Sequence, residues 1–492
     1  MTTDRLHRSA LPAHLDTPVN PDRVGIVHLG IGAFHRAHQA VFTELAARAT
    51  GDRSWGILGV TQRSASVRDQ LRPQGGVYTV LTAGTHESRL DLVGSVLDVA
   101  WPAEETARVL EAMAAPTTHV VTLTVTEKGY ARGADGGLDV ARVRPDLDAL
   151  AAGDTAPPGT TAVGLLVRGL AARWRAGQEA GERRPITVLT CDNMVDNGRV
   201  LERLVGEAVD AALPDGAGEG LRSWLATDVA FPCSMVDRIV PATTAEQRHA
   251  VERTLGARDE GLVVGEPFRQ WVIEDRFAGP RPAWEEAGAT FTDDVAPWEQ
   301  AKLRLLNGTH SLLAYAGRLA GHATLAEAVT DPALHERARA FMLDDALPTL
   351  TPPDGADLHA YAESLLDRFA NPATGHTTVQ VSMDGTQKIP FRWGGVVADR
   401  LAAGAVPSGV AFALAAWSEV VRRETATGRR MDDPRAAELA DVVTRAGVDD
   451  AAAVARALLA LPGLLPGGAG TDRRLVDAVV DHLREVVPEL AR

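Results

Sequence analysis

Short apolar runs alternate with amphipathic segments along the N-terminal part of the chain. The runs predict strands at 23–30, 55–60, 78–81, 119–126 and 186–190. Segments rich in Ala and Leu lie between them with helical spacing, for example 104–113 and 162–176. Strands that alternate with helices predict an α/β fold with a parallel, doubly wound sheet.

Helical spacing dominates after about residue 285. We expect helices at 299–319, 324–329, 334–343, 359–369, 410–422, 436–446, 451–461 and 474–487. The one strand expected here is 377–383, before a turn at Asp384 and Gly385. The pattern thus predicts a doubly wound domain over residues 1–285, followed by a mainly α-helical domain over residues 286–492.

The composition is typical of a soluble globular protein. Of the 492 residues, 45% are hydrophobic and 23% are charged, and the 50 Lys and Arg against 65 Asp and Glu give a net charge of −15. Such an acidic chain does not attract nucleic acids or anionic membranes, so we expect a small-molecule partner.

Cysteine content and hydropathy favour a cytoplasmic location. The only two cysteines, Cys191 and Cys233, exclude a disulfide framework. No stretch approaches the ~20 apolar residues of a membrane helix, and the N-terminus shows no apolar run typical of a signal peptide.

The loop after the first predicted strand has the pattern of a dinucleotide site. Gly30-Ile31-Gly32 stands between a strand and a helix, where a cofactor pyrophosphate binds. Gly30 permits a tight turn, and Gly32 lets backbone N–H groups approach the phosphates. His35 occupies the position of the third glycine of the usual fingerprint. A tight turn that binds nothing is the alternative, but the strand–turn–helix context favours the cofactor site.

The segment after the second strand leaves the choice between NAD and NADP open. An acidic residue there would hold the ribose hydroxyls of NAD, but no carboxylate occurs before Asp69. Arg63 and Arg68 are candidates for contact with a 2′-phosphate, or are solvated loop charges.

Three polar residues share one side of the helix expected at 299–319. In an α-helix, Asn307 lies about 140° and His310 about 80° round the axis from Lys302. The Asn-Gly pair within this pattern costs roughly 1 kcal/mol of helix stability, and such local exceptions often occur at functional sites.

These three residue types suit hydride transfer at an alcohol or ketone carbon. Without a metal, this reaction needs a group that moves the hydroxyl proton, neutral donors to the developing alkoxide, and a group that orients the substrate. A partly buried Lys302 suits the first role, Asn307 the second and His310 the third. The alternative is that Lys302 is an ordinary lysine on a helix surface.

Further candidates follow other predicted strands. Asn193 and Asn197 come after the strand at 186–190, where parallel sheets bind ligands. Asp237 follows an apolar run, and Arg269 stands among aromatic residues. Helix caps, turns and structural ion pairs are the alternative roles. No histidine or cysteine spacing is typical of zinc, so no metal is expected.

Several ordered motifs resemble those of the mannitol dehydrogenase family, the polyol-specific long-chain dehydrogenase/reductases. They are Gly30-Ile-Gly-Ala-Phe-His-Arg-Ala-His38, Thr124-Val-Thr-Glu127, Cys191-Asp-Asn193, Met235-Val-Asp-Arg238, Glu266-Pro-Phe-x-Gln-Trp271 and Lys302-x4-Asn307-x2-His310. The resemblance implies a metal-independent enzyme with an N-terminal Rossmann-type domain and a largely helical C-terminal domain.

The resemblance also implies roles for single residues. Lys302 would be the general acid/base, and Asn193 and Asn307 would form the oxyanion hole. Asp237 and His310 would position substrate. The remaining assignments from the resemblance are proton exchange with water for Glu299 and substrate binding for Lys388. The candidates for cofactor binding are Gly30, Ile31, Gly32, Ala33, Phe34, Arg63, Thr126 and Glu127.

Within the family, the sequence is most similar to fructuronate reductases. Examples are Thr126-Glu-Lys-Gly-Tyr130 and Gln380-Val-Ser-Met-Asp-Gly-Thr-Gln-Lys388, with glutamine where mannitol 2-dehydrogenases have arginine. The expected reaction therefore interconverts a linear keto-sugar acid and its hydroxy acid, D-fructuronate and D-mannonate. Its carboxylate needs a cation, for which Arg269, Lys388 and Arg392 are candidates.

Two alternatives stay open at this stage. The nearer one is a mannitol 2-dehydrogenase or another polyol dehydrogenase, acting on mannitol and fructose or on arabinitol and xylulose. The other is a catalytically inactive NAD-binding regulatory protein, which the joint presence of the polar residues above disfavours. The resemblance implies NAD as cofactor, with NADP not excluded, and a monomer.

Overall fold

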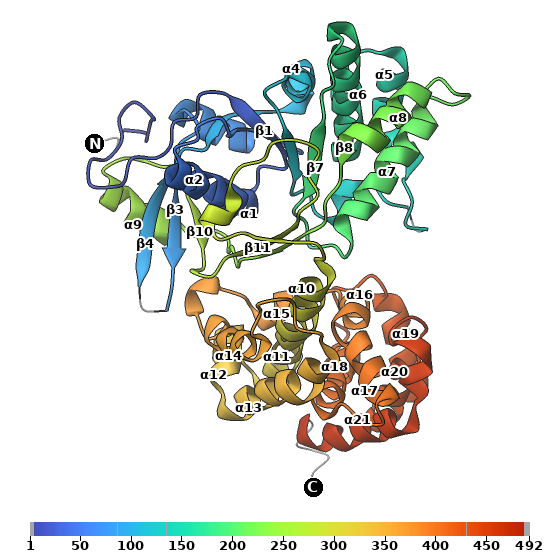
Figure 1. Cartoon of the computed structure of the whole chain (residues 1–492). Coiled ribbons are helices and arrows are strands. Elements are labelled where there is room, and N and C mark those ends of the chain that lie inside the picture. Colours follow the sequence, from blue (N-terminus) through green and yellow to red (C-terminus); the bar gives the residue numbers. More distant parts are fainter. Residues whose placement is uncertain (1–3, 86, 134, 430, 487–492) are drawn as a thin grey trace. The chain divides into compact units, whose positions relative to one another are not determined.

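The computed structural model describes residues 4–85, 87–133, 135–429 and 431–486. Contacts divide the chain into two compact units, Met1–Ala296 and Pro297–Arg492 (Figure 1). Each unit has a hydrophobic core of its own.

A six-stranded parallel sheet forms the centre of the first unit. Its strands are β1 (Val24–Leu29), β2 (Gly56–Val60), β5 (Val96–Ala100), β6 (Val120–Leu123), β7 (Ile186–Thr190) and β8 (Val229–Ala230). Their spatial order is β5-β2-β1-β6-β7-β8, and every neighbouring pair is parallel. Taken along the chain, this is the order third, second, first, fourth, fifth, sixth of the Rossmann fold. The predicted α/β fold class is confirmed.

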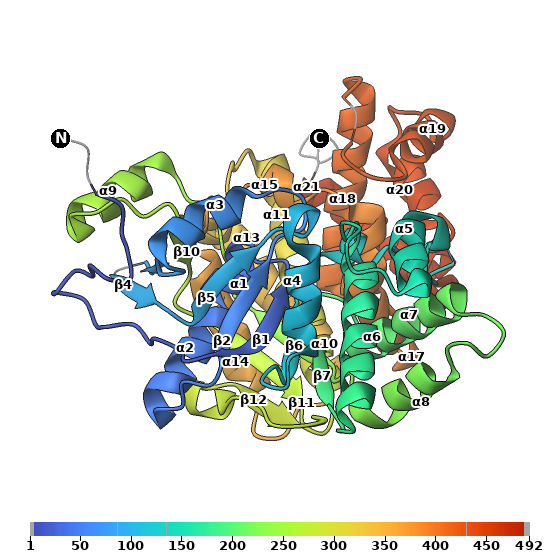
Figure 2. The same ribbon diagram turned by 90° about the horizontal axis from the view of Figure 1, so that it is seen from above.

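Helices cover both faces of this sheet, which explains why its strands are nearly continuous apolar runs. The helices of the unit are α1 (Ala33–Ala37), α2 (Gln39–Thr50), α3 (Ser66–Leu71), α4 (Pro102–Ala114), α5 (Val140–Ala152), α6 (Ala162–Ala180), α7 (Asn197–Ala212), α8 (Glu219–Asp228) and α9 (Ala245–Leu255). Val27 and Leu29 of β1 pack in one core with α4, α5, α6 and α7, whereas Ile26 packs in the other with α1 and α2. Figure 2 shows α4 and α6 along the sheet.

The strand predicted at 78–81 does not join the parallel sheet. β3 (Tyr78–Ala83) pairs with β4 (Ser88–Val93) in an antiparallel hairpin, and β10 (Val263–Gly265) completes a separate three-stranded sheet. Another small sheet consists of β9 (Ser234–Asp237), β11 (Gln270–Glu274) and β12 (Thr290–Thr292). The expectation of a single alternating sheet was wrong here, because a short loop after β3 lets the chain fold straight back.

The second unit consists of helices joined by loops, with no named strand among its described residues. It comprises most of α10 (Ala296–Ala301), then α11 (Gly308–Ala320), α12 (Leu325–Thr330), α13 (Pro332–Ala340), α14 (Leu358–Phe369), α15 (Thr378–Val381), α16 (Gly385–Ile389), α17 (Gly395–Ala402), α18 (Ser408–Ala426), α19 (Ala436–Ala446), α20 (Ala451–Leu459) and α21 (Arg473–Val486). Within the described ranges, no helix of either unit has the length and apolarity needed to cross a membrane.

The strand predicted at 377–383 is wrong, because α15 occupies this segment. The Thr377 hydroxyl accepts a hydrogen bond from the Gln380 N–H at 3.1 Å, which caps the helix. An alternating polar and apolar run of this length fits one helical turn as well as a strand, and the cap decides between them.

The helix predicted at 299–319 is present but changes its winding. Between α10 and α11, residues Lys302–Asn307 form a π-helix, and two further π segments cover Phe341–Ala346 and Pro390–Gly394. Both pack against the first, so all three π segments meet in one part of the unit. Such segments are rare and occur mostly at functional sites.

Candidate functional site

The strand order of the large sheet reverses between β1 and β6. In open parallel sheets, ligands bind at the carboxyl ends of the strands beside such a reversal. The segments that leave β1, β6 and β7 here contain Gly30–Gly32, Thr126–Glu127 and Asn193. The fold therefore brings three sequence-predicted parts of the site to one edge of the sheet.

The glycine loop after β1 meets the requirements of a dinucleotide site. Gly30 has φ +97°, and a Cβ there would lie 2.1 Å from the Thr124 carbonyl oxygen, so only glycine fits. A Cβ on Gly32 would meet only the Gly30 oxygen, at 3.9 Å, so internal packing does not demand glycine. The open space above Gly32, beside N–H groups of the first helical turn at Ala33 and Phe34, fits the pyrophosphate of NAD.

A histidine stack replaces the third glycine of the fingerprint. The rings of His35 in α1 and His28 in β1 lie 3.4 Å apart, so they make the close helix–strand contact that glycine usually permits. Burial lowers the pKa of His28 to about 3 and holds the pKa of His35 well below its usual value, so both rings are neutral. Within the described ranges, no group of three or more His, Cys, Asp or Glu side chains could hold a metal ion.

A strained turn follows β6. Thr126 has φ 64° and ψ 161°, a combination that is essentially confined to glycine and costs of order 1–3 kcal/mol for other residues. The Asp192 carboxylate holds this turn, since it accepts hydrogen bonds from Val125 N–H at 2.9 Å, Thr126 N–H at 2.8 Å and the Tyr130 hydroxyl at 2.8 Å. Burial raises the pKa of Asp192, and these hydrogen bonds oppose that effect. Sequence reasoning overlooked Asp192, although it directly follows a buried strand in the Cys191-Asp-Asn193 motif.

The two asparagines after β7 have different environments. Asn193 is exposed at the ligand edge. Asn197 is fully buried, and its side chain donates to the carbonyls of Asp192 and Ser234 and accepts from Ser234 N–H. The expectation that Asn197 faces the ligand was wrong: it ties the end of β7 to β9.

Asp237 and Arg269 lie on the neighbouring small sheet. Asp237 is buried at the end of β9, where it pairs with Gln270 of β11. The guanidinium of Arg269 lies 5.6 Å from the ring centre of Phe42, and burial lowers its pKa. Arg238 donates to the backbone carbonyls of Glu266 and Ala37.

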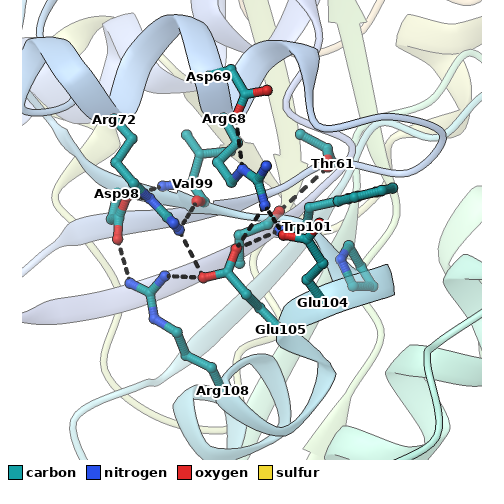
Figure 3. A network of polar contacts seen from close by, with 12 residues as sticks. Thr61, Arg68, Asp69, Arg72, Asp98, Val99, Trp101, Glu104, Glu105 and Arg108 are labelled. Atoms are coloured by element: carbon teal, nitrogen blue, oxygen red, sulfur yellow. Dashed lines mark hydrogen bonds and ion pairs between the residues drawn. The ribbon is translucent and has the colours of Figure 1, made fainter.

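An ion-pair network occupies the ends of β2 and β5, at the adenosine side of a Rossmann fold (Figure 3). Arg68 donates to Glu104 at 2.6 Å and to Asp69 at 2.9 Å, and it lies over the ring of Trp101. Because Arg68 is bound by these carboxylates, the structure does not support its predicted contact with a 2′-phosphate. The other candidate for this contact, Arg63, is exposed. The network continues through Arg72, Asp98, Glu105 and Arg108.

In the second unit, the π-helix brings Lys302 and Asn307 to the same side. Its hydrogen bonds join residues five apart, as between Gly308 N–H and the Leu303 carbonyl, so residues at i and i+5 lie one above the other. The α-helical geometry expected from the sequence separated these two side chains too widely. Glu299 is buried in α10, just before Lys302.

The Asn-Gly pair has a packing reason. A Cβ on Gly308 would lie 2.7 Å from Cζ of Phe341, in the second π segment. The indole N–H of Trp393, in the third, donates to the Gly308 carbonyl at 3.1 Å. Glycine therefore lets the three π segments approach closely.

His310 is a neutral, buried imidazole among cations. Its ring lies 4.6 Å from Phe369 and 5.7 Å from His376, and its Nε2 has no hydrogen-bond partner among the described residues. Burial has the largest effect on the pKa of His310 and holds it well below the usual value. Electrostatic effects of four neighbours lower the pKa further, namely His376, Arg392, Arg368 and Lys302. A buried ring nitrogen without a partner suits a substrate hydroxyl.

Arg392 lies close enough to both His310 and Lys388 to lower the pKa of each. Arg392 donates to the Asn307 carbonyl at 3.1 Å and to Ser311 Oγ at 2.8 Å, and desolvation lowers its pKa to about 10. Lys388 Nζ donates to the Val381 carbonyl at 3.3 Å, and desolvation lowers its pKa to about 8. Asp384, Asp432 and Asp433 lie close enough to Lys388 to oppose this lowering of its pKa, whereas no carboxylate acts on Arg392 in this way among the described residues.

Comparison with known proteins agrees with this arrangement. Residues 24–286 match the model of the mannitol dehydrogenase Rossmann domain, and residues 294–485 match the mannitol dehydrogenase C-terminal domain. The D-mannonate oxidoreductase of Escherichia coli (strain K12) is 39% identical over 477 residues, which cover 95% of this chain and 94% of the relative.

Solved structures share the fold over the whole chain. A substrate-free D-sorbitol dehydrogenase matches with a TM-score of 0.83 and 28% identity, covering 99% of both chains. A ternary complex of Pseudomonas fluorescens mannitol 2-dehydrogenase with NAD and D-mannitol matches with a TM-score of 0.76 and 32% identity, covering 100% of this chain and 95% of that one. The chain therefore belongs to the mannitol dehydrogenase family of oxidoreductases.

Proposed function

We propose that this protein is an NAD-dependent oxidoreductase that reduces D-fructuronate to D-mannonate and catalyses the reverse reaction. The observation that carries the proposal is the pair of cations Arg392, which acts on His310, and Lys388, on which Arg392 acts in turn. Arg392 and Lys388 are partly desolvated, and their hydrogen bonds go to neutral oxygens. A desolvated guanidinium such as that of Arg392, with hydrogen bonds only to neutral oxygens, suits a substrate that brings its own carboxylate.

The side chains named above divide the work of carbonyl reduction. Lys302 donates a proton to the carbonyl oxygen as it becomes a hydroxyl, and removes it in the reverse direction. The Asn307 and Asn193 amides donate hydrogen bonds to that oxygen while negative charge develops on it. His310 Nε2 and Asp237 hold substrate hydroxyl groups. When bound, NAD supplies or accepts the hydride.

Glu299 completes the proton path in this proposal. It lies in α10, three residues before Lys302, so both side chains are on the same face of the helix. A carboxylate there exchanges the lysine proton with water between turnovers. We further expect a monomer in the cytoplasm, and both cysteines are free thiols.

A comparison of substrates tests the proposal. Oxidation of NADH is followed at 340 nm with fructuronate, tagaturonate, fructose and xylulose, and the reverse reactions with mannonate and mannitol. We expect a kcat/KM about ten- to hundredfold higher for fructuronate than for fructose, which is the effect of one charge-assisted contact. Lys388→Met lowers the value for fructuronate and leaves that for fructose nearly unchanged.

A polyol dehydrogenase is the second candidate function. It is favoured by the similarity to the mannitol 2-dehydrogenase that was solved with D-mannitol. Full activity on mannitol and fructose, with none on mannonate, supports this candidate and contradicts the first. Cofactor binding without turnover on any of these substrates would instead favour a regulatory NAD-binding protein.

A further inference from the structure

Lysine is rare in this chain and stands at selected positions. Only three of its 50 basic residues are lysines, namely Lys128, Lys302 and Lys388, and all others are arginines. A compact ammonium and a planar guanidinium are not interchangeable where geometry matters. Lys302 and Lys388 belong to the proposed site, so Lys128 is the one lysine without an assigned role.

Lys128 lies at the ligand edge of the large sheet. It is exposed on the turn Glu127–Tyr130, which follows β6 beside the reversal of strand order. The Thr124 hydroxyl donates to the Gly30 carbonyl at 2.8 Å, so the end of β6 is tied to the glycine loop. An anion bound at this edge of the sheet is therefore next to the turn that carries Lys128.

The turn that presents Lys128 is fixed at both ends. Asp192 accepts from Thr126 N–H and from the Tyr130 hydroxyl, and Gly129 N–H donates to the Thr126 carbonyl at 2.8 Å. A strained conformation persists only where its surroundings enforce it, and such conformations cluster at ligand sites. The buried Asp192 thus holds in place a turn whose exposed tip bears a lysine.

We propose that Lys128 binds an oxyanion of a ligand at this edge, an inference that rests on the proposed function. In the described part of the chain, Lys128 has neither an ion-pair partner nor a side-chain hydrogen bond. The oxyanion is either the pyrophosphate of NAD or the carboxylate of the sugar acid, and both offer the same charge-assisted contact.

Three variants test the role of Lys128. Lys128→Met removes the charge and keeps the length, Lys128→Arg keeps the charge, and Arg142→Met removes an exposed cation from α5 of the same unit as a matched control. The dissociation constant of NADH is measured by fluorescence titration, and KM is measured for fructuronate and for fructose.

We expect Lys128→Met to weaken the binding of one of the two ligands, NADH or fructuronate, about ten- to hundredfold. The loss is smaller for Lys128→Arg, and the Arg142→Met control shows none. A higher dissociation constant for NADH assigns the contact to the pyrophosphate, whereas a higher KM for fructuronate alone assigns it to the carboxylate. Equal results for Lys128→Met and the control overturn the proposal, as do equal losses in both Lys128 variants. A wild-type enzyme without turnover of fructuronate contradicts the proposed function instead, and the NADH titration still reports on Lys128.

Discussion

Replacement of Lys302 by methionine separates catalysis from folding and cofactor binding. The side chain is 8% exposed, so methionine of similar length fills its space without a cavity. The replacement also removes a charge that lies close enough to His310 to lower the pKa of that imidazole. Because the Lys302 side chain also has a polar or electrostatic contact within the chain, the melting temperature is measured beside kcat to show that the variant is folded.

The expected loss of turnover follows from the role of the lysine. General acid–base catalysis contributes about 10²- to 10⁴-fold, which corresponds to about 2.7 to 5.4 kcal/mol in the activation barrier. We expect the dissociation constant of NADH to stay within about twofold of wild type, because the proposed role of Lys302 is proton transfer to the substrate and not a contact with the cofactor phosphates. The combination of unchanged NADH binding and a large loss of kcat identifies a residue that acts in the chemical step.

Arg304→Met is the matched control for this prediction. Arg304 belongs to the same π-helix, but its Nη1 donates to Asp399 at 2.6 Å and to the Thr349 carbonyl at 2.9 Å. Because this ion pair is half-exposed, we expect a loss of about 1 kcal/mol or less in stability and a nearly unchanged kcat. Steady-state kinetics with fructuronate and thermal unfolding measure both quantities. If Lys302→Met keeps more than about a tenth of kcat, or loses no more than Arg304→Met, Lys302 is not the general acid.

Three further outcomes follow from particular contacts. Gly30→Ala abolishes NADH binding in fluorescence titration and lowers the melting temperature, because the Cβ of alanine would lie 2.1 Å from the Thr124 carbonyl oxygen. NADH binding close to that of the wild type would contradict the proposed role of the glycine loop. Lys388, with its pKa lowered to about 8, loses its charge as the pH rises through that value. We therefore expect the KM for fructuronate to rise above pH 8 while the KM for fructose does not. If the KM values of both substrates change with pH in the same way, Lys388 does not contact the carboxylate. Glu104→Gln removes one of the carboxylate charges that hold Arg68, while Asp69 and Glu105 stay, and we expect it to lower the KM for NADPH relative to NADH. An unchanged ratio shows that this network does not select the cofactor.

Much of the fold follows from local patterns. The apolar runs before Gly30 and Cys191 predict buried parallel strands, and these strands end where the ligand edge lies. The small sheets could not be predicted as such, because the run from Tyr78 suits an antiparallel hairpin as well as a parallel strand. Partner strands far away along the sequence decide between these two arrangements.

The candidate site was only partly predictable, for two physical reasons. The spacing of Lys302, Asn307 and His310 indicates one helix face, but apolar spacing does not distinguish a π-helix from an α-helix. Asp192 was overlooked because a carboxylate after a strand commonly belongs to a solvated turn. Its significance depends on the strained backbone of Thr126, which no sequence pattern reveals.

The π-helix at Lys302–Asn307 makes the length of this segment as important as its composition. Deletion of a single residue here would give back ordinary α-helical winding, with better hydrogen bonds for the backbone. The asparagine would then stand four residues after the lysine, a spacing that places both side chains on one face of an α-helix. Inserting a residue into an α-helix without this wide turn would instead rotate the following residues by about 100°, so the π winding is what lets Lys302 and Asn307 share one side at a spacing of five.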